Sequence, residues 1–99
     1  MPAIFDEIEW DQGNRDKCGK HGVSVDEIEY ALRGLPLIVE DPSHSTQEQR
    51  FRAIGRNEAG RPIFVVFTVR QRGERFLARP LSARYMHSKE VRFYEQDQA

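Results

Sequence analysis

Lys20 and His21 stand side by side in the first quarter of the chain, followed by a glycine and, two positions later, a serine. A lysine can hold a phosphate as a point charge, and a histidine with a pKa near ~6.5 can accept or donate a proton at neutral pH. The pair could therefore serve acid–base chemistry on a phosphate. The same two residues are also typical of the last turn of a helix, where cations interact favourably with the helix dipole.

Arginine is the second group that could carry chemistry. Residues 1–48 contain eleven acids and four bases, a net charge of −7, whereas residues 49–99 contain eleven bases and five acids, a net charge of +6. Ten of those eleven bases are arginine, whose planar fork suits phosphate. This asymmetry suits a phosphate-rich partner, but from charge alone solvated strand edges and salt bridges between the two halves are the slightly favoured explanation.

Three arginines are the strongest candidates for a charge cluster. Arg79 lies between Leu77 and Leu81 on one predicted strand face, so it must be paired or line a concave surface. Arg84 follows at the end of that strand, and Arg50 lies on an earlier strand. They could stabilise the charge on a phosphate undergoing displacement. Alternatively, they form ion pairs with carboxylates, for which Glu48 and Glu90 are the candidates.

Other reactive side chains offer less. Asp41 and His44 could form a metal pair or an Asp–His dyad, but two ligands make a poor metal site and a turn is the simpler interpretation. Cys18 has no second thiol and is expected to fill apolar space, and His87 is expected to be solvated. We therefore expect no metal and no cofactor.

These residues must be positioned by an N-terminal strand and two helices. Alternation from Ile4 to Trp10 predicts a strand. Asp11 can cap a helix that runs to about Lys20, with Gly22 as its stop. Ser24 and Glu27 have the spacing of a capping box for a second helix, which lasts until Gly34.

The rest of the chain predicts a meander and a final helix. Hairpin turns are expected at 57–60 and 71–73, and a strand with apolar residues on both faces should lie in the centre of the sheet. The last helix is expected over Met86–Gln96, with Met86, Glu90, Phe93 and Tyr94 along one side. The expected strands are Leu35–Glu40, Gln49–Gly55, Pro62–Arg70 and Arg75–Ala83. This order of elements predicts an α+β fold.

Length and composition set outer limits. The chain has 99 residues, of which 38% are hydrophobic and 31% charged, which favours a single domain over residues 1–99. No apolar run approaches the roughly 20 residues of a membrane helix, and the acidic start is unlike a signal peptide. With one cysteine, the sequence favours a cytoplasmic protein.

Six motifs in order resemble the BrnT toxins of bacterial type II toxin–antitoxin systems over nearly the whole chain. The chain differs from the family pattern in two respects. Tyr85 stands where a second basic residue is usual, and the last helix, which is usually strongly basic, keeps only Lys89 and Arg92 as cations. The matching segments are Trp10–Asp11, Lys20–Ser24, Asp41–Pro42 with His44–Ser45, Arg50–Phe51 with Ile54–Arg56, Arg79 with Ser82–Arg84, and Glu90 with Tyr94–Glu95.

The resemblance implies a RelE-like fold, a compact antiparallel sheet packed against two N-terminal helices and one C-terminal helix. It implies a metal-independent endoribonuclease that inhibits translation. The reaction that we expect is 2′-OH transesterification of RNA. The implied partner, besides RNA, is a ribbon-helix-helix antitoxin (BrnA-like), through which the complex contacts DNA. The expected catalytic residues are His21 as acid or base, with Lys20, Arg50, Arg79 and Arg84 on the phosphate.

The alternative is a non-catalytic module of the same fold that binds RNA or an antitoxin. The near-neutral net charge and the presence of Tyr85 motivate it. An RNA cleavage assay with EDTA present separates the two functions.

Overall fold

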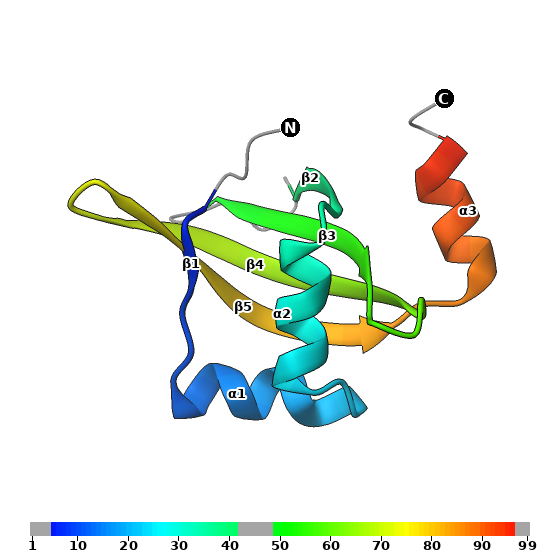
Figure 1. The fold of residues 1–99 in the computed structure, drawn as a ribbon, viewed down its shortest axis with the longest axis horizontal. Coiled ribbons are helices and arrows are strands. Elements are labelled where there is room, and N and C mark those ends of the chain that lie inside the picture. Colours follow the sequence, from blue (N-terminus) through cyan, green and yellow to red (C-terminus); the bar gives the residue numbers. More distant parts are fainter. Residues whose placement is uncertain (1–4, 42–48, 97–99) are drawn as a thin grey trace.

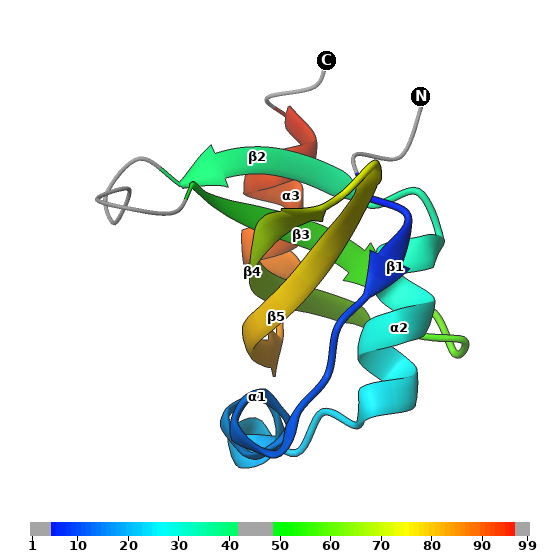
Figure 2. The same cartoon turned by 90° about the vertical axis from the view of Figure 1, so that its left-hand side faces the viewer.

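The computed structural model describes residues 5–41 and 49–96. It shows an α+β fold, as predicted, in which helices lie on both sides of a twisted sheet (Figures 1 and 2). In chain order the elements are β1 (Glu7–Ile8), α1 (Gln12–Cys18), the 3-10 helix η1 (Gly19–His21), α2 (Val25–Arg33), β2 (Leu37–Asp41), β3 (Arg50–Arg56), β4 (Pro62–Arg72), β5 (Arg75–Tyr85) and α3 (Ser88–Gln96). None of the helices described is long and apolar enough to cross a membrane.

α1 and α2 each begin with a capping box, in which side chains bond to the backbone of the first turn. Ser24 accepts a hydrogen bond from the backbone N–H of Glu27, whose carboxylate accepts one from the Ser24 N–H, so the predicted capping box is confirmed. Asp11 caps α1 as predicted, and Asn14 completes a second capping box there that was not predicted. Such caps are worth about 1 kcal/mol each, because they satisfy backbone N–H groups that the helix leaves unpaired.

The five strands form one sheet in the order β1-β5-β4-β3-β2, with β4 in the centre as predicted. An antiparallel sheet was expected, but the observed sheet is mixed, because β1 pairs parallel to β5. Only Glu7–Ile8 of the expected Ile4–Trp10 strand is extended against β5, and Ile4 lies outside the described residues. Since Asp11 must turn the chain to cap α1, the strand cannot continue past this short pairing.

The other boundaries differ by a few residues. The second hairpin turn follows Arg72 rather than spanning 71–73, with Gly73 at a φ of +62° that glycine adopts at low cost. The last helix begins at Ser88 and not at Met86, because the Met86 N–H still bonds to the Pro62 carbonyl in the sheet. Of the residues expected along one side of this helix, Met86 is buried before the helix begins and Phe93 is 63% exposed.

The sheet has two unlike faces. One, the covered face, packs against α1 and α2, and its buried side chains include Phe67, Ile63 and Val65 of β4. α2 approaches so closely that a Cβ placed on Gly55 would lie 2.8 Å from the Ala31 carbonyl oxygen. The opposite face carries α3 only at one end, where Ile54, Met86 and Val91 form a small second cluster with Phe64 and Tyr94 (Figure 2).

Candidate functional site

Several arginines lie on this second face of the sheet, which we call the arginine face. Residues directly opposite in antiparallel strands share a face, so each register row places three side chains together. The rows across β3, β4 and β5 are Arg50–Thr68–Arg79, Arg52–Val66–Ser82 and Ile54–Phe64–Arg84. The sheet thus brings Arg50, Arg79 and Arg84, predicted from the sequence, onto one surface.

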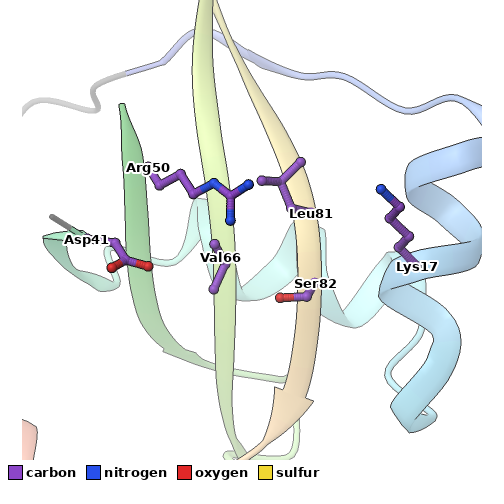
Figure 3. Close-up of a pocket in the computed structure, with 6 residues that line it drawn as sticks. All are labelled: Lys17, Asp41, Arg50, Val66, Leu81 and Ser82. Atoms are coloured by element: carbon purple, nitrogen blue, oxygen red, sulfur yellow. The ribbon is translucent and has the colours of Figure 1, made fainter. Parts of the chain in front are cut away.

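A pocket of about 410 Å³ lies on the arginine face (Figure 3). β3, β4 and β5 form its floor, and the end of α1 contributes Lys17 from the side. The lining residues are Lys17, Asp41, Arg50, Val66, Leu81 and Ser82. Leu81 enters the pocket where the β4–β5 register shifts, since Val66 pairs with Ser82 and Phe67 with Pro80, leaving Leu81 unpaired between them.

Two cations of this pocket have no carboxylate partner within residues 5–41 and 49–96. They are Lys17, which is exposed, and Arg50, which is partly buried. Asp41 is buried and lies 3.0 Å from Arg52, and this contact raises the pKa of the arginine. The pocket therefore presents two cations whose charge is available to an anion.

Arg79 is held by the N-terminal segment. Its Nη1 donates to the Asp11 carboxylate at 2.5 Å and lies 3.7 Å from Glu9. The hydrogen bond from Arg79 is the main reason why the pKa of Asp11 falls from 3.8 to about 2. Glu9 also lies 2.9 Å from Arg72 and 3.8 Å from Arg70. Carboxylates of the acidic first half thus pair with arginines of the basic second half, which confirms the salt-bridge explanation of the charge asymmetry.

Arg84 is held by the last helix. Its two terminal nitrogens donate to both carboxylate oxygens of Glu90, at 3.0 and 2.8 Å, and its guanidinium lies 4.7 Å from the centre of the Phe64 ring. Arg84 is the first cause of the pKa of Glu90 falling to about 2, and the backbone N–H of His87 adds to it. The ion pair with Glu90 that the sequence offered as an alternative is therefore present.

Lys20 and His21 are both exposed, in η1, and neither lines the pocket. Gly22 follows at a φ of +82° and ends this helical segment, as predicted. Neither side chain makes a hydrogen bond or ion pair with the part of the chain that the structure describes. Because Lys17 precedes them by three and four residues along a continuous helical stretch, all three side chains project from nearby positions.

Sequence reasoning missed Lys17, Ser82 and Thr68. Lys17 could have been found from its spacing to Lys20 and His21. Ser82 lies within a recognised motif, but its position opposite Val66 depends on the bulge, which no local pattern predicts. Thr68 interrupts an apolar strand, and that interruption was the available signal.

The other residues that could carry chemistry show no sign of a functional site where the structure describes them. Cys18 is buried, and desolvation raises the pKa of its thiol to about 11, which suits a space-filling side chain. His87 is exposed, as expected, just before α3. His44 and Glu48 lie outside the described residues, so neither the proposed dyad nor an Arg50–Glu48 pair can be placed. Within residues 5–41 and 49–96, no three potential ligand side chains gather as a metal site.

Tyr85 has a structural position on the covered face. Its hydroxyl lies 2.9 Å from both carboxylate oxygens of Glu27, to which it donates, and Arg61 lies 3.6 Å above its ring. Asn57 also donates to Glu27, and this hydrogen bond is the main reason why the pKa of Glu27 is lowered. The tyrosine thus joins the end of β5 to the start of α2.

Comparison with known proteins gives one family. A model of the ribonuclease toxin BrnT, of type II toxin–antitoxin systems, matches residues 10–90. The matched range includes both capped helices, every residue that lines the pocket, and Glu90. No curated protein matches the chain.

Proposed function

The chain belongs to the BrnT family of ribonuclease toxins of type II toxin–antitoxin systems, and from this premise we propose that it is an endoribonuclease that cleaves RNA on the arginine face. The observation that carries the proposal is the pocket in which Lys17 and Arg50 converge without carboxylate partners among the described residues. Two such cations fit a phosphodiester, whose charge they can neutralise.

The proposed reaction is metal-independent. A ribose 2′-OH loses its proton to a base and attacks the adjacent phosphorus, the P–O5′ bond breaks, and an acid protonates the leaving 5′-oxygen. The products are a 2′,3′-cyclic phosphate and a 5′-hydroxyl. This chemistry requires proton transfer and stabilisation of the extra negative charge on the phosphate, with no change of oxidation state.

His21 is the proposed acid or base, with Lys20 as a phosphate ligand beside it. Their exposure leaves them open to a bound strand, and their helical spacing from Lys17 supports a path from the pocket to η1. Arg50 is the proposed phosphate ligand within the pocket itself. Consecutive phosphates of one RNA strand would then meet Arg50, Lys17 and Lys20 in turn.

Arg79 and Arg84 are proposed to act in a second way. Both are already held by carboxylates, Arg79 by Asp11 and Arg84 by Glu90. They contribute to the field of the arginine face while paired, and bind phosphate directly only if RNA displaces the carboxylate. Their substitution should therefore reduce binding less than substitution of Arg50.

A non-catalytic binding module is the second candidate function. It is favoured by one observation, namely that His21 makes no hydrogen bond within the described residues that would orient its ring as a proton carrier. Such a module would bind RNA at Arg50 and leave it intact.

The deciding experiment is cleavage of a labelled RNA in EDTA by the parental protein and three variants. We expect cleavage by the parental protein and a loss of roughly a hundredfold in His21→Gln with binding nearly kept. Arg50→Ala should lower both binding and turnover. Arg33→Ala is the matched control, because it removes an exposed cation from α2, on the other side of the sheet. Binding without cleavage by the parental protein would establish the second candidate.

The wider assignments rest on the family. We propose that residues 1–99 act as one RelE-like domain in the cytoplasm, that cleavage inhibits translation, and that a ribbon-helix-helix antitoxin neutralises the toxin. A type II system implies an antitoxin protein. Co-expression with the protein encoded beside the toxin, followed by co-purification and rescue of growth, tests the last two statements.

A further inference from the structure

The hydroxyl of Thr68 makes no hydrogen bond that would stabilise the fold within the described residues. Thr68 lies in the middle of β4, is 2% exposed, and its Oγ1 is buried without a hydrogen-bond partner among the residues described. A buried hydroxyl that is stripped of water and given no partner destabilises the folded state. Valine has nearly the same shape, favours strands and would avoid this cost. A threonine at this position is therefore better explained by a ligand than by packing.

The surroundings of Thr68 indicate which ligand. Its register neighbours on the two sides are Arg50 and Arg79, and alternation along β4 places it on the same face as Val66, a pocket residue two positions earlier. The Arg50 side chain runs across β4 toward Leu81 (Figure 3). Thr68 thus lies beside the pocket residue Arg50, in a row where both neighbours are cations.

We propose that Thr68 is part of a phosphate subsite, in which its hydroxyl donates a hydrogen bond to a phosphodiester oxygen held by Arg50. The inference deepens the proposed function, on which it rests, by naming a phosphate-positioning residue. Arg50 lies over β4 when the site is empty and turns its guanidinium toward the incoming phosphate. This movement uncovers the Thr68 hydroxyl, which then gains the partner that it lacks.

An anion with several acceptor oxygens fits this site better than a cation or a neutral group. Arg50 offers only donors, and a threonine hydroxyl can donate once its proton turns toward an acceptor. Arg79 adds positive charge from the other side, even while its guanidinium donates to Asp11. A cation would meet two guanidinium groups here, and an apolar ligand would leave the hydroxyl unpaired.

The first test compares Thr68→Val with Thr68→Ser. Binding of a non-cleavable 2′-O-methyl RNA should weaken about tenfold in Thr68→Val, since the variant loses one hydrogen bond to a charged acceptor. Its melting temperature should stay equal or rise by a few degrees, because the unpaired hydroxyl is gone. Thr68→Ser, which keeps the hydroxyl, should bind within about twofold of the parental protein.

The outcomes of this comparison support or overturn the role of the Thr68 hydroxyl in binding phosphate. Unchanged RNA binding in Thr68→Val overturns the proposal, because the hydroxyl would then touch no ligand. Equal weakening in Thr68→Val and Thr68→Ser also overturns it, because the shape of the side chain and not its hydroxyl would matter. Weaker binding together with equal or higher stability supports it, since a merely structural hydroxyl would not separate the two measurements in this direction.

The second test measures ligand binding in the parental protein, and a variant serves only to assign an NMR signal. The chain contains two threonines, Thr46 and Thr68, so selective labelling of threonine methyl groups gives two NMR signals. The signal that Thr68→Ser removes belongs to Thr68. Titration of the parental protein with inorganic phosphate should shift this signal saturably, whereas chloride at matched ionic strength should not. An unmoved Thr68 signal, with phosphate and with RNA, overturns the subsite.

Failure of the subsite differs from failure of the proposed function. A protein that binds 2′-O-methyl RNA through Thr68 but cleaves no RNA refutes catalysis and keeps the subsite. A protein that cleaves RNA at equal kcat/KM in Thr68→Val and in the parental form keeps catalysis and refutes the subsite. A Thr68 signal that shifts with inorganic phosphate but not with RNA assigns the site to a free anion and refutes its role in RNA binding.

Discussion

The covered face and the arginine face belong to the same three central strands, yet they are stabilised in different ways. On the covered face, side chains such as Phe67, Ile63 and Val65 are fully buried against α1 and α2. On the arginine face, the equivalent positions of β3 and β5 carry cations, most of them held by carboxylates from other elements. Alternation along a strand lets one segment serve both purposes, with stability on one side and binding capacity on the other.

The comparison also locates what is available for function. Arg79 and Arg84 have partners, whereas Arg50 and Lys17 have none within residues 5–41 and 49–96. A guanidinium already bound to a carboxylate must give up that contact before it can hold a phosphate. The number of arginines on a surface therefore overstates its capacity to bind RNA, which depends on how many of them already pair with carboxylates.

The largest expected effect compares two phenylalanines of β4. Phe67→Ala removes a fully buried ring from the covered face and should lower the free energy of unfolding by about 3–5 kcal/mol. Phe64→Ala removes a partly buried ring from the other face and should cost less than half as much, because solvent already reaches it. Urea unfolding of both variants measures the difference. Equal losses would show that the two faces contribute equally to stability.

The next effect concerns the contact between α2 and the covered face. Gly55→Ala places a methyl group 2.8 Å from the Ala31 carbonyl oxygen, so the helix must shift, at a cost of about 1–3 kcal/mol. Gly60→Ala is the contrasting variant, in which the added Cβ meets no atom within 4 Å but the φ of +87° is strained. Thermal unfolding measures the stability of both variants. Near-ultraviolet circular dichroism of the folded proteins, which reports aromatic packing, should differ from the parental spectrum only in Gly55→Ala.

A pair of serines gives a smaller effect. Ser24→Ala removes the cap of α2 and should cost about 1 kcal/mol, with RNA cleavage kept in the folded protein. Ser82→Ala, in the pocket, should change stability by less than about 0.5 kcal/mol, because Ser82 is exposed. Chemical denaturation measures both. If Ser24→Ala stays folded and loses cleavage, Ser24 belongs to the site and the division between the faces is wrong.

The smallest effect is the pH dependence of the paired carboxylates, which solvent screens. The pKa values of Asp11 and Glu90 fall from 3.8 and 4.5 to about 2 in the folded protein. Their stabilisation is therefore present above about pH 4.5 and lost as the pH falls toward 2. Asp11→Asn, which can still cap α1, and Glu90→Gln should each reduce the acid-induced loss of stability between pH 5 and 2.5. Parallel pH profiles in variant and parental proteins would contradict this assignment.

Local patterns predicted much of the fold. The Ser24–Glu27 box, the end of a helix at Gly22 and the central position of β4 follow from spacing and composition alone, because each depends on residues close in sequence. The parallel pairing of β1 with β5 could not be predicted, since a two-residue strand has no period of its own. Its position depends on where Asp11 turns the chain.

The site was less predictable than the fold. The sequence identified Arg50, Arg79 and Arg84, but not which of them pairs with a carboxylate among residues 5–41 and 49–96. The partners of Arg79 are Glu9 and Asp11, between β1 and α1, and the partner of Arg84 is Glu90 in α3. Lys17 and Thr68 each left a local signal in the sequence, but what lies beside them, the pocket for Lys17 and two arginines for Thr68, depends on the sheet. A residue's role on this face is set by its neighbours across the sheet, which lie many positions away in the sequence.

The pairing of the N-terminal segment with β5 has a consequence for how the chain folds. The Phe76 N–H donates to the Asp6 carboxylate across 70 positions of sequence, whereas β3, β4 and β5 are joined by short hairpins. Because closing a long loop costs more entropy than closing a hairpin, the meander should form first and the N-terminal segment dock last. During synthesis, residues 5–9 leave the ribosome long before their partner strand exists. Pulsed hydrogen exchange should then show late protection of the Asp6 and Glu9 amides, and Arg79 would receive its carboxylates only in that final step.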